Sequence, residues 1–402
     1  MKNNQKILIY LTEVIFVLST LMLASKKMVD ILHLILKVNF ISVTVVSSIS
    51  VISLCILIFL NRDSLKINLK WFIVLFIMLL IIFISSYTNM YFGFVTDFWN
   101  IIKSYMYVLL LIIVLSFNLC FRYKETMKKI VLFFITGQSL IGILQAIVNK
   151  PIIPIINKDG NIIVNTIYYL NGGSSTSYNL LLLGGRVRAF GITDSGLTLG
   201  LFGMLGIALI IDEKNKLLKS VLGTIYVITI YLTYTRIIWI ATCVYLSLVL
   251  LNKIKIGKRI YILGWVIQLL LVCIFSSDYI MLLFNDYPTV ISRIQGIQYY
   301  INNLSLSLKD LLFGQNFVNY IDYFSKVTVY TLDNELLVIV ANIGIIGLVI
   351  LISVYYKAMN FFKNNTVQLL LSMFSVIGIG NSVAYFYFPI ICILILMKNV
   401  RG

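Results

Sequence analysis

Arg186 and Arg188 stand two residues apart just before an apolar run that begins at Gly196. In an extended segment this spacing leaves both guanidinium groups available. Arginine forms bidentate bonds to phosphate and keeps its charge at any pH. The pair therefore indicates a clamp for a phosphate group. A pair that only contacts lipid headgroups at a membrane surface is the alternative, and the sequence alone does not decide between the two.

Arg236 ends the motif Leu232-Thr233-Tyr234-Thr235-Arg236, which lies between two apolar runs joined by almost no loop. Arginine in hydrocarbon costs about 2.5–3.5 kcal/mol on insertion scales, and less at a helix end from which the side chain reaches water. Because a tight turn has cheaper residues to use, Arg236 indicates anion binding. A topological anchor is the alternative, but such anchors are expected on the inner side of a membrane.

Arg293 and Gln298 belong to a stretch in which four isoleucines recur at helical spacing: Ile291, Ile294, Ile297 and Ile301. The pattern predicts an amphipathic helix on the outer surface of a membrane, with Arg293 and Gln298 near its polar side. A surface helix with a purely structural role is the alternative for most of these residues.

Asp333, Asn334 and Glu335 directly precede another apolar run. A carboxylate at such a position could act as a general base on a hydroxyl group. Asp, Asn and Glu are also good residues for beginning a helix. For Glu335 the helix start is the better interpretation, whereas for Asp333 both interpretations stay open.

Long apolar runs must position these polar motifs. Of the 402 residues 60% are hydrophobic and only 12% are charged, whereas soluble domains carry roughly 25% charged residues. Many runs approach the ~20 residues that cross a bilayer as a helix, and they lack the alternation of barrel strands. We therefore predict an all-α, polytopic transmembrane bundle of about twelve spans, residues 1–402 forming a single membrane domain. Its two large outer loops are residues 149–195 and 276–334. The glycines Gly344, Gly347, Gly378 and Gly380 are expected to permit close helix packing.

The charge distribution predicts the orientation. Roughly two thirds of the 32 basic residues, but only about a quarter of the 15 acidic ones, fall in segments predicted to be inside. This asymmetry persists to the C-terminus, so both termini are expected in the cytoplasm. It also accounts for the net charge of +17 without nucleic acid as a partner. With one histidine, His33, and five cysteines that form no CxxC pair, neither a metal site nor a cofactor is expected.

In this order and membrane placement, the motifs resemble the O-antigen and capsular polysaccharide polymerase (Wzy) family, within the O-antigen ligase/polymerase superfamily. The resemblance covers roughly residues 185–351. The matching segments are Arg188 to Gly191, Thr233 to Arg236, Arg293 to Tyr300, Leu312-Phe313-Gly314, and Asp333-Asn334 followed by Asn342 to Gly347. Two positions depart from the pattern. Asp333 stands where the ligase branch has a histidine, which favours polymerase over ligase. After Gly314, Gln315-Asn316 follows where the family usually has a second glycine.

The resemblance implies a metal-independent, inverting glycosyl transfer on the outer face of the bacterial cytoplasmic membrane. A growing glycan would leave its undecaprenyl pyrophosphate carrier and join a hydroxyl of a new lipid-linked repeat unit. Arg188 and Arg236 would bind the donor pyrophosphate with help from Arg186, and Asp333 would activate the acceptor. Arg293, Gln298 and Asn334 are the further candidates for substrate binding. Besides the two lipid-linked glycans, the expected partners are membrane lipids, and a chain-length regulator is left open.

Three other functions compete with this one. A flippase for the same lipid-linked glycan would be expected to show internal repeats and polar groups near the midplane, neither of which is evident here. The ligase branch is disfavoured by Asp333. A membrane scaffold without activity would not need arginines at outer junctions between spans and loops.

Overall fold

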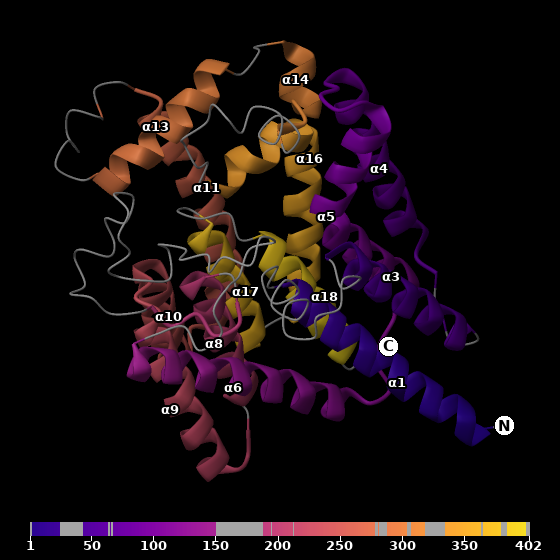
Figure 1. Cartoon of the computed structure of the whole chain (residues 1–402), viewed down its shortest axis with the longest axis vertical. Helices are drawn as coiled ribbons and strands as arrows, with labels where there is room; N and C mark the ends of the chain where they lie inside the picture. The colour runs from indigo at the N-terminus through magenta and orange to yellow at the C-terminus, as the bar shows by residue number, and fades with distance from the viewer. Residues whose placement is uncertain are drawn as a thin grey trace. The chain divides into compact units, whose positions relative to one another are not determined.

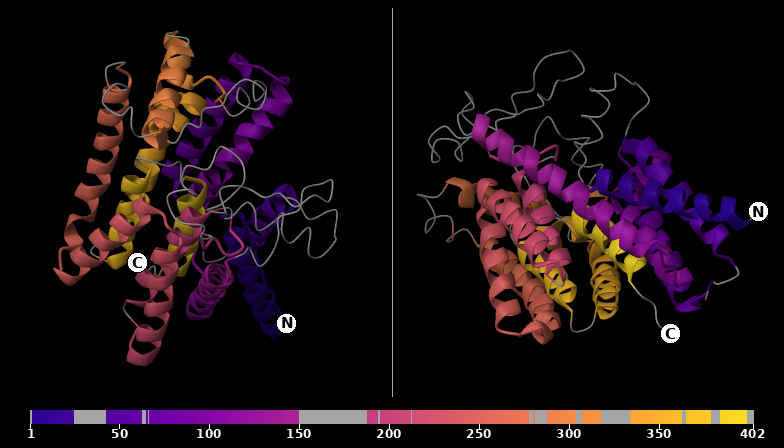
Figure 2. Two further views of the ribbon diagram at one scale, coloured as in Figure 1. Left: turned by 60° about the vertical axis from the view of Figure 1, so that its left-hand side comes forward. Right: turned by 90° about the horizontal axis from the view of Figure 1, so that it is seen from below.

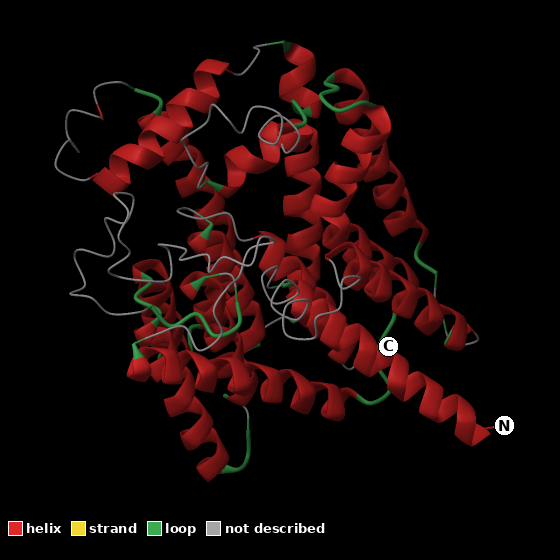
Figure 3. Ribbon diagram, viewed as in Figure 1, coloured by secondary structure: helices red, strands yellow, loops and turns green. Residues whose placement is uncertain are grey.

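The structure is a computed structural model in which every regular element of the described residues is helical (Figures 1 and 3). The described residues are 2–24, 43–62, 65, 67–149, 188–193, 195–211, 213–277, 280, 288–303, 307–317, 334–362, 365–378 and 384–398. No strand occurs within these ranges, so the predicted all-α class is confirmed.

Among the described residues, six helices are long and apolar enough to cross a membrane. They are α1 (Lys2–Leu23), α4 (Leu69–Thr88), α5 (Phe94–Phe117), α6 (Lys124–Val148), α11 (Gly257–Phe275) and α16 (Glu335–Asn360). The shorter apolar helices are α3 (Val43–Leu60), α8 (Gly196–Ile210), α10 (Arg236–Leu250), α17 (Thr366–Ile377) and α18 (Ala384–Met397). These helices give the chain the character of a membrane protein. The total of about twelve spans stays a prediction.

The chain forms two compact units, each assembled from separated stretches of sequence. The first comprises Met1–Leu65, Cys120–Lys253 and Ile393–Gly402, and the second comprises Lys66–Leu119 and Ile254–Cys392. They are described separately below. The single membrane domain predicted for residues 1–402 is not tested by this division and stays a prediction.

In the first unit, α8 is buried on nearly all of its surface and packs against α6, α10 and α9 (Lys216–Leu232). A helix that is apolar all round belongs in the interior of a bundle. Helix α6 packs against both α8 and α9 and crosses α9 in Figure 1. Helices α6 and α9 contact the segment that carries Arg188, and this segment leads into α8.

Glu13, in the middle of α1, is fully buried and lies next to the start of α6. Its two carboxylate oxygens accept the backbone N–H groups of Arg122, at 2.7 Å, and Tyr123, at 3.1 Å. These N–H groups lie at the start of α6, where a helix has no internal acceptors and attracts negative charge. Glu13 therefore caps α6 and fastens it to α1.

In the second unit, α4 packs against α5, and α11 packs against α17 (Figure 2). Helix α5 begins at Phe94, seven residues before the apolar run that starts at Ile101. The carboxylate of Asp97 accepts the backbone N–H groups of Tyr91, at 2.6 Å, and Phe92, at 3.2 Å. This local capping begins the helix almost two turns before the apolar run.

Candidate functional site

Arg188 lies in a short non-helical segment that ends at Ser195 and leads into α8. Gly191 in this segment has a φ of +61°, a left-handed conformation that glycine adopts without steric cost. A Cβ atom there would lie 2.8 Å from the side-chain oxygen of Gln138. Ser195 then caps α8 by accepting the backbone N–H of Thr198 at 3.3 Å. The glycine of the Arg188 motif is therefore needed for a bend that packs closely against α6.

Two glutamines on α6 hold this bend. The side-chain oxygen of Gln145 accepts the backbone N–H groups of Phe190, at 3.1 Å, and Gly191, at 2.9 Å. The amide nitrogen of Gln145 donates to the Gly191 carbonyl at 2.7 Å. Gln138 accepts the N–H of Ile192 at 2.8 Å. Since Gln138 and Gln145 are seven residues apart, they share one face of α6, and together they fix the backbone that follows Arg188.

The turn between α9 and α10 lies against the same segment. The backbone N–H of Ala189 donates to the carbonyl of Leu232, the last residue of α9, at 2.9 Å. A Cβ atom at Gly196 would lie 2.9 Å from the carbonyl oxygen of Thr233, so the start of α8 also touches this turn. Arg236 begins α10 only three residues later. The fold thus brings together two motifs that are separated by about 45 residues in the sequence.

Arg188 and Arg236 are close enough to repel each other. Burial lowers the pKa of the Arg188 guanidinium, and the positive charge of Arg236 lowers it further. The Nε of Arg188 is buried without a hydrogen-bond partner, and no carboxylate of the described residues forms an ion pair with this side chain. Arg236 is exposed. Two cations held together, without an acidic partner in the part of the chain that the structure describes, favour the binding of an external anion.

In the second unit, Arg293 and Gln298 lie on α13 (Pro288–Asn303). The helix is amphipathic as predicted, because Arg293 is exposed while Ile294 and Ile297 are buried. Ile297 and Tyr300 pack in a cluster with residues of α11 and α16. Gln298 is an exception. It was expected near the polar side, but it is buried and donates to the carbonyl of Ser277 at 3.3 Å. Gln298 therefore ties α13 to the end of α11 and does not face solvent.

Two of the sequence motifs interlock in this unit. Gly314, at the end of α14 (Leu308–Phe313), and Gly344, inside α16, both have positive φ, of +87° and +70°. Cβ atoms at these positions would collide with the backbones of Asn342 and Leu312, respectively. The N–H of Gln315 donates to the carbonyl of Ala341 at 2.8 Å. Gly344 does allow close packing, as predicted, but it also breaks α16 into two helical pieces, which the sequence analysis did not predict.

Polar side chains surround this break in α16. Ser85 on α4 donates to the Asn342 carbonyl at 2.7 Å. The amide of Asn89 donates to Asp310, at 3.2 Å, and to the Gly314 carbonyl, also at 3.2 Å. A helix break inside a membrane span is tolerated where neighbouring groups satisfy the freed backbone atoms. The break therefore fastens the end of α14 to α16 and α4.

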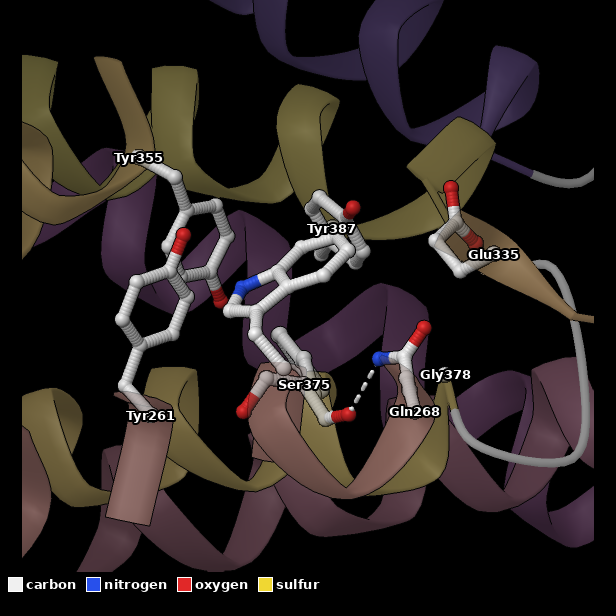
Figure 4. A pocket seen from close by; sticks show the side chains of 9 residues that line it. Tyr261, Gln268, Glu335, Tyr355, Ser375, Gly378 and Tyr387 are labelled. Atoms are coloured by element: carbon white, nitrogen blue, oxygen red, sulfur yellow. Dashed lines mark hydrogen bonds between the residues drawn. The ribbon is translucent and has the colours of Figure 1, made fainter. Parts of the chain in front are cut away.

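Asn334 begins α16 as its N-cap, since its side-chain oxygen accepts the backbone N–H of Leu337 at 3.1 Å. Glu335 is buried in a cluster that includes Tyr387 and Gln268 (Figure 4). The centre of this cluster is too tight for a water molecule, so Glu335 lies within the packed core. Gln268 on α11 links this helix to α16 and α17. Its amide nitrogen donates to the backbone carbonyl of Ser375 at 2.8 Å, and its side-chain oxygen accepts the backbone N–H of Leu336 at 3.2 Å.

The structure thus groups the predicted site residues in two places. Arg188 and Arg236 meet in the first unit, and Arg293, Gln298 and Asn334 belong to the second. Arg186 and Asp333 lie outside the described residues. Sequence reasoning missed Gln138 and Gln145. The signal for them is the presence of two amides seven residues apart in an apolar span, where polar groups are costly.

No protein-family model, curated protein or solved structure matches the chain.

Proposed function

We propose that the chain is a polysaccharide polymerase that joins undecaprenyl-pyrophosphate-linked repeat units on the outer face of the bacterial cytoplasmic membrane. One observation carries the proposal: two arginine motifs that are distant in sequence converge at Arg188 and Arg236, and no carboxylate of the described residues is paired with Arg188. We assign the counter-charge to a substrate anion, and pyrophosphate has this character. The placement of the two motifs beside membrane helices supports a lipid-linked anion.

The reaction needs two things from the protein: a base for the acceptor hydroxyl and positive charge for the leaving group. The acceptor hydroxyl attacks the anomeric carbon of the donor sugar, and its proton passes to a base, for which Asp333 is the candidate. The bond between this carbon and the pyrophosphate oxygen breaks, with inversion, and undecaprenyl pyrophosphate leaves. Arg188 and Arg236, assisted by Arg186, stabilise the charge that develops on the leaving group. Because pyrophosphate is already a good leaving group, the reaction needs no metal ion.

The second unit would serve the other substrate. Arg293 is exposed on α13, a helix whose apolar face packs against α11 and α16, and we assign it to the phosphate of the second lipid-linked glycan. The side chain of Gln298 holds α13 to the end of α11, and the side chain of Asn334 caps the start of α16. Their proposed contribution to substrate binding is thus indirect: Gln298 would help to position Arg293, and Asn334 would help to position Asp333.

The test is the length of the surface glycan in cells that carry Arg188→Ala or Arg236→Ala at normal protein levels. Loss of a group that stabilises developing charge lowers rates by roughly 10²–10³-fold, so we expect exported single repeat units that are not joined. Arg62→Ala is the matched control, because Arg62 is an exposed arginine of the same unit near the end of a helix. This control should leave long chains.

Each rival function predicts a different result. A flippase defect would trap the lipid-linked units on the inner face of the membrane. A ligase defect would leave long polymers that are still bound to the lipid carrier. Unchanged long surface chains in both arginine variants would overturn the proposal.

A further inference from the structure

Tyr234, in the turn between α9 and α10, has a backbone conformation that is unusual for an aromatic residue. Among the described residues, five that are not glycine have positive φ, and four of them are asparagines: Asn118, Asn149, Asn252 and Asn316. Tyr234, with a φ of +49°, is the fifth. Asparagine tolerates the left-handed conformation, whereas a bulky side chain there is strained.

The asparagines show what such positions normally require in this chain. Asn118 and Asn149 end α5 and α6 in the left-handed conformation, and Asn252 follows α10 in the same way. Tyr234 follows α9 at an equivalent place, where glycine or asparagine would be less strained. Local strain of this kind is typical of functional sites, so the tyrosine ring itself calls for an explanation.

The ring belongs to a compact group of three, formed by Tyr231, Tyr234 and Trp239, which we call the aromatic platform. Tyr231 stacks on Trp239, with ring centroids 5.5 Å apart and planes inclined by 12°. The Tyr234 centroid lies 6.1 Å from that of Tyr231 and 6.3 Å from that of Trp239. Trp239 is fixed by a hydrogen bond of 2.9 Å from its indole nitrogen to the carbonyl of Ile230. The platform is thus preformed, and Tyr231 is 58% exposed on it.

The platform adjoins the two arginines. Trp239 lies three residues after Arg236 on α10, so the two side chains share one face of this helix. Tyr231 precedes Leu232, the residue whose carbonyl holds the Arg188 segment through Ala189 at 2.9 Å. The rings and the cation pair therefore converge on one turn of the first unit.

We propose that the aromatic platform binds the sugar ring that is attached directly to the pyrophosphate held by Arg188 and Arg236. This inference rests on the proposed function. The apolar C–H face of a pyranose packs on an aromatic face, and tyrosine and tryptophan also present a polar group to its hydroxyls. A sugar joined to a bound pyrophosphate lies one bond away from that anion. The strain at Tyr234 is explained because glycine or asparagine would leave the turn intact but remove one ring.

Tyr234→Gly removes the aromatic ring but keeps a residue that adopts the left-handed conformation of the turn. Purified full-length protein in nanodiscs is titrated with two probes, undecaprenyl pyrophosphate and undecaprenyl pyrophosphate that carries N-acetylglucosamine. The wild type should bind the sugar-bearing lipid more tightly, by about tenfold, the order expected for one well-packed aromatic contact. Tyr234→Gly should abolish this difference, keep the affinity for undecaprenyl pyrophosphate and keep or raise the Tm. Tyr234→Phe should preserve the difference.

Asn252→Gly is the matched control, because it places glycine at another left-handed position of the same unit that has no platform. It should leave the preference for the sugar-bearing lipid unchanged. The platform proposal is overturned if the wild type binds both lipids equally, if Tyr234→Gly retains the preference, or if Tyr234→Gly weakens both lipids to the same extent. If the platform instead anchored the protein at the membrane surface or contacted the isoprenoid chain, the titrations would give one of these three results.

The proposed function fails in a distinguishable way. Arg188→Ala and Arg236→Ala should weaken the binding of both probes, because each removes a contact with the pyrophosphate. Unchanged binding of undecaprenyl pyrophosphate by both arginine variants would contradict the proposed anion site, whatever Tyr234→Gly does to the preference for the sugar.

Discussion

Gln145 serves three backbone groups of the Arg188 segment from within α6, and it is completely buried. A buried amide in an apolar span is costly unless its hydrogen bonds are made. Here the bonds join a membrane helix to the loop that carries the candidate phosphate ligand. The contribution of Arg188 to the proposed reaction depends on its exact position, because catalytic rates fall steeply when a charged group moves by about 1 Å.

We expect Gln145→Leu to lower both stability and activity. It leaves two N–H groups and one carbonyl without partners, and each such buried group costs about 1–3 kcal/mol. Thermal unfolding in detergent should show a lower Tm, and the surface glycan should shorten as it does for Arg188→Ala. Leu144→Ala is the control, because Leu144 is the neighbouring side chain and is 49% exposed. If Gln145→Leu left the glycan long, the positioning role would be refuted.

At the scale of elements, the sequence predicted the apolar runs well and the breaks poorly. The tight turn that precedes Arg236 and the start of α8 after Ser195 appear where hydropathy and capping residues place them. The break at Gly344 was missed, because a glycine in an apolar run reads equally well as a packing residue. A helix break is needed here because the backbone of Leu312, about 30 residues earlier, packs against Gly344. The local sequence pattern around Gly344 contains no information about this distant contact.

Gly344→Ala should destabilise the second unit. Gly344 has a φ of +70° and a ψ of −177°, a region essentially restricted to glycine, so a side chain there costs about 1–3 kcal/mol. The added Cβ also meets the Leu312 backbone. Gly137→Ala in α6 is the control, since a Cβ atom there has nothing within 4 Å. Alanine is also the better helix former, by about 1 kcal/mol. Fluorescence-detected unfolding should therefore show a lower Tm for the first variant and an equal or higher Tm for the second; equal Tm values would mean that α16 tolerates a continuous helix.

At the scale of the whole molecule, the distribution of charge predicts an orientation that helix packing does not reveal. The long apolar helices agree with a membrane protein, but their order across the membrane depends on the positive-inside rule. The division into two units was not predicted, because each unit joins stretches that are far apart in the chain. Periodicity reports on which face of a helix is apolar, and it carries no information about which distant helix covers that face.

The orientation can be tested with single cysteines in a cysteine-free background. Ser175→Cys, outside the described residues, is predicted to react with a membrane-impermeant maleimide in intact cells, because the first large outer loop contains it. Lys216→Cys should react only after the membrane is opened, because it lies in a segment predicted inside and is exposed. Labelling of Lys216→Cys but not Ser175→Cys in intact cells would invert the topology and place Arg188 and Arg236 on the wrong side for the proposed reaction.

The cap that Glu13 forms on α6 has a consequence for the synthesis of the protein. Its two partners lie 109 and 110 residues further along the chain. At ribosomal rates of about 5–20 residues per second, Arg122 is made roughly 5–20 s after Glu13. During this interval the first helix carries a carboxylate without its final partners at the membrane. The contacts between α1 and α6 therefore form only after more than a quarter of the chain has been made.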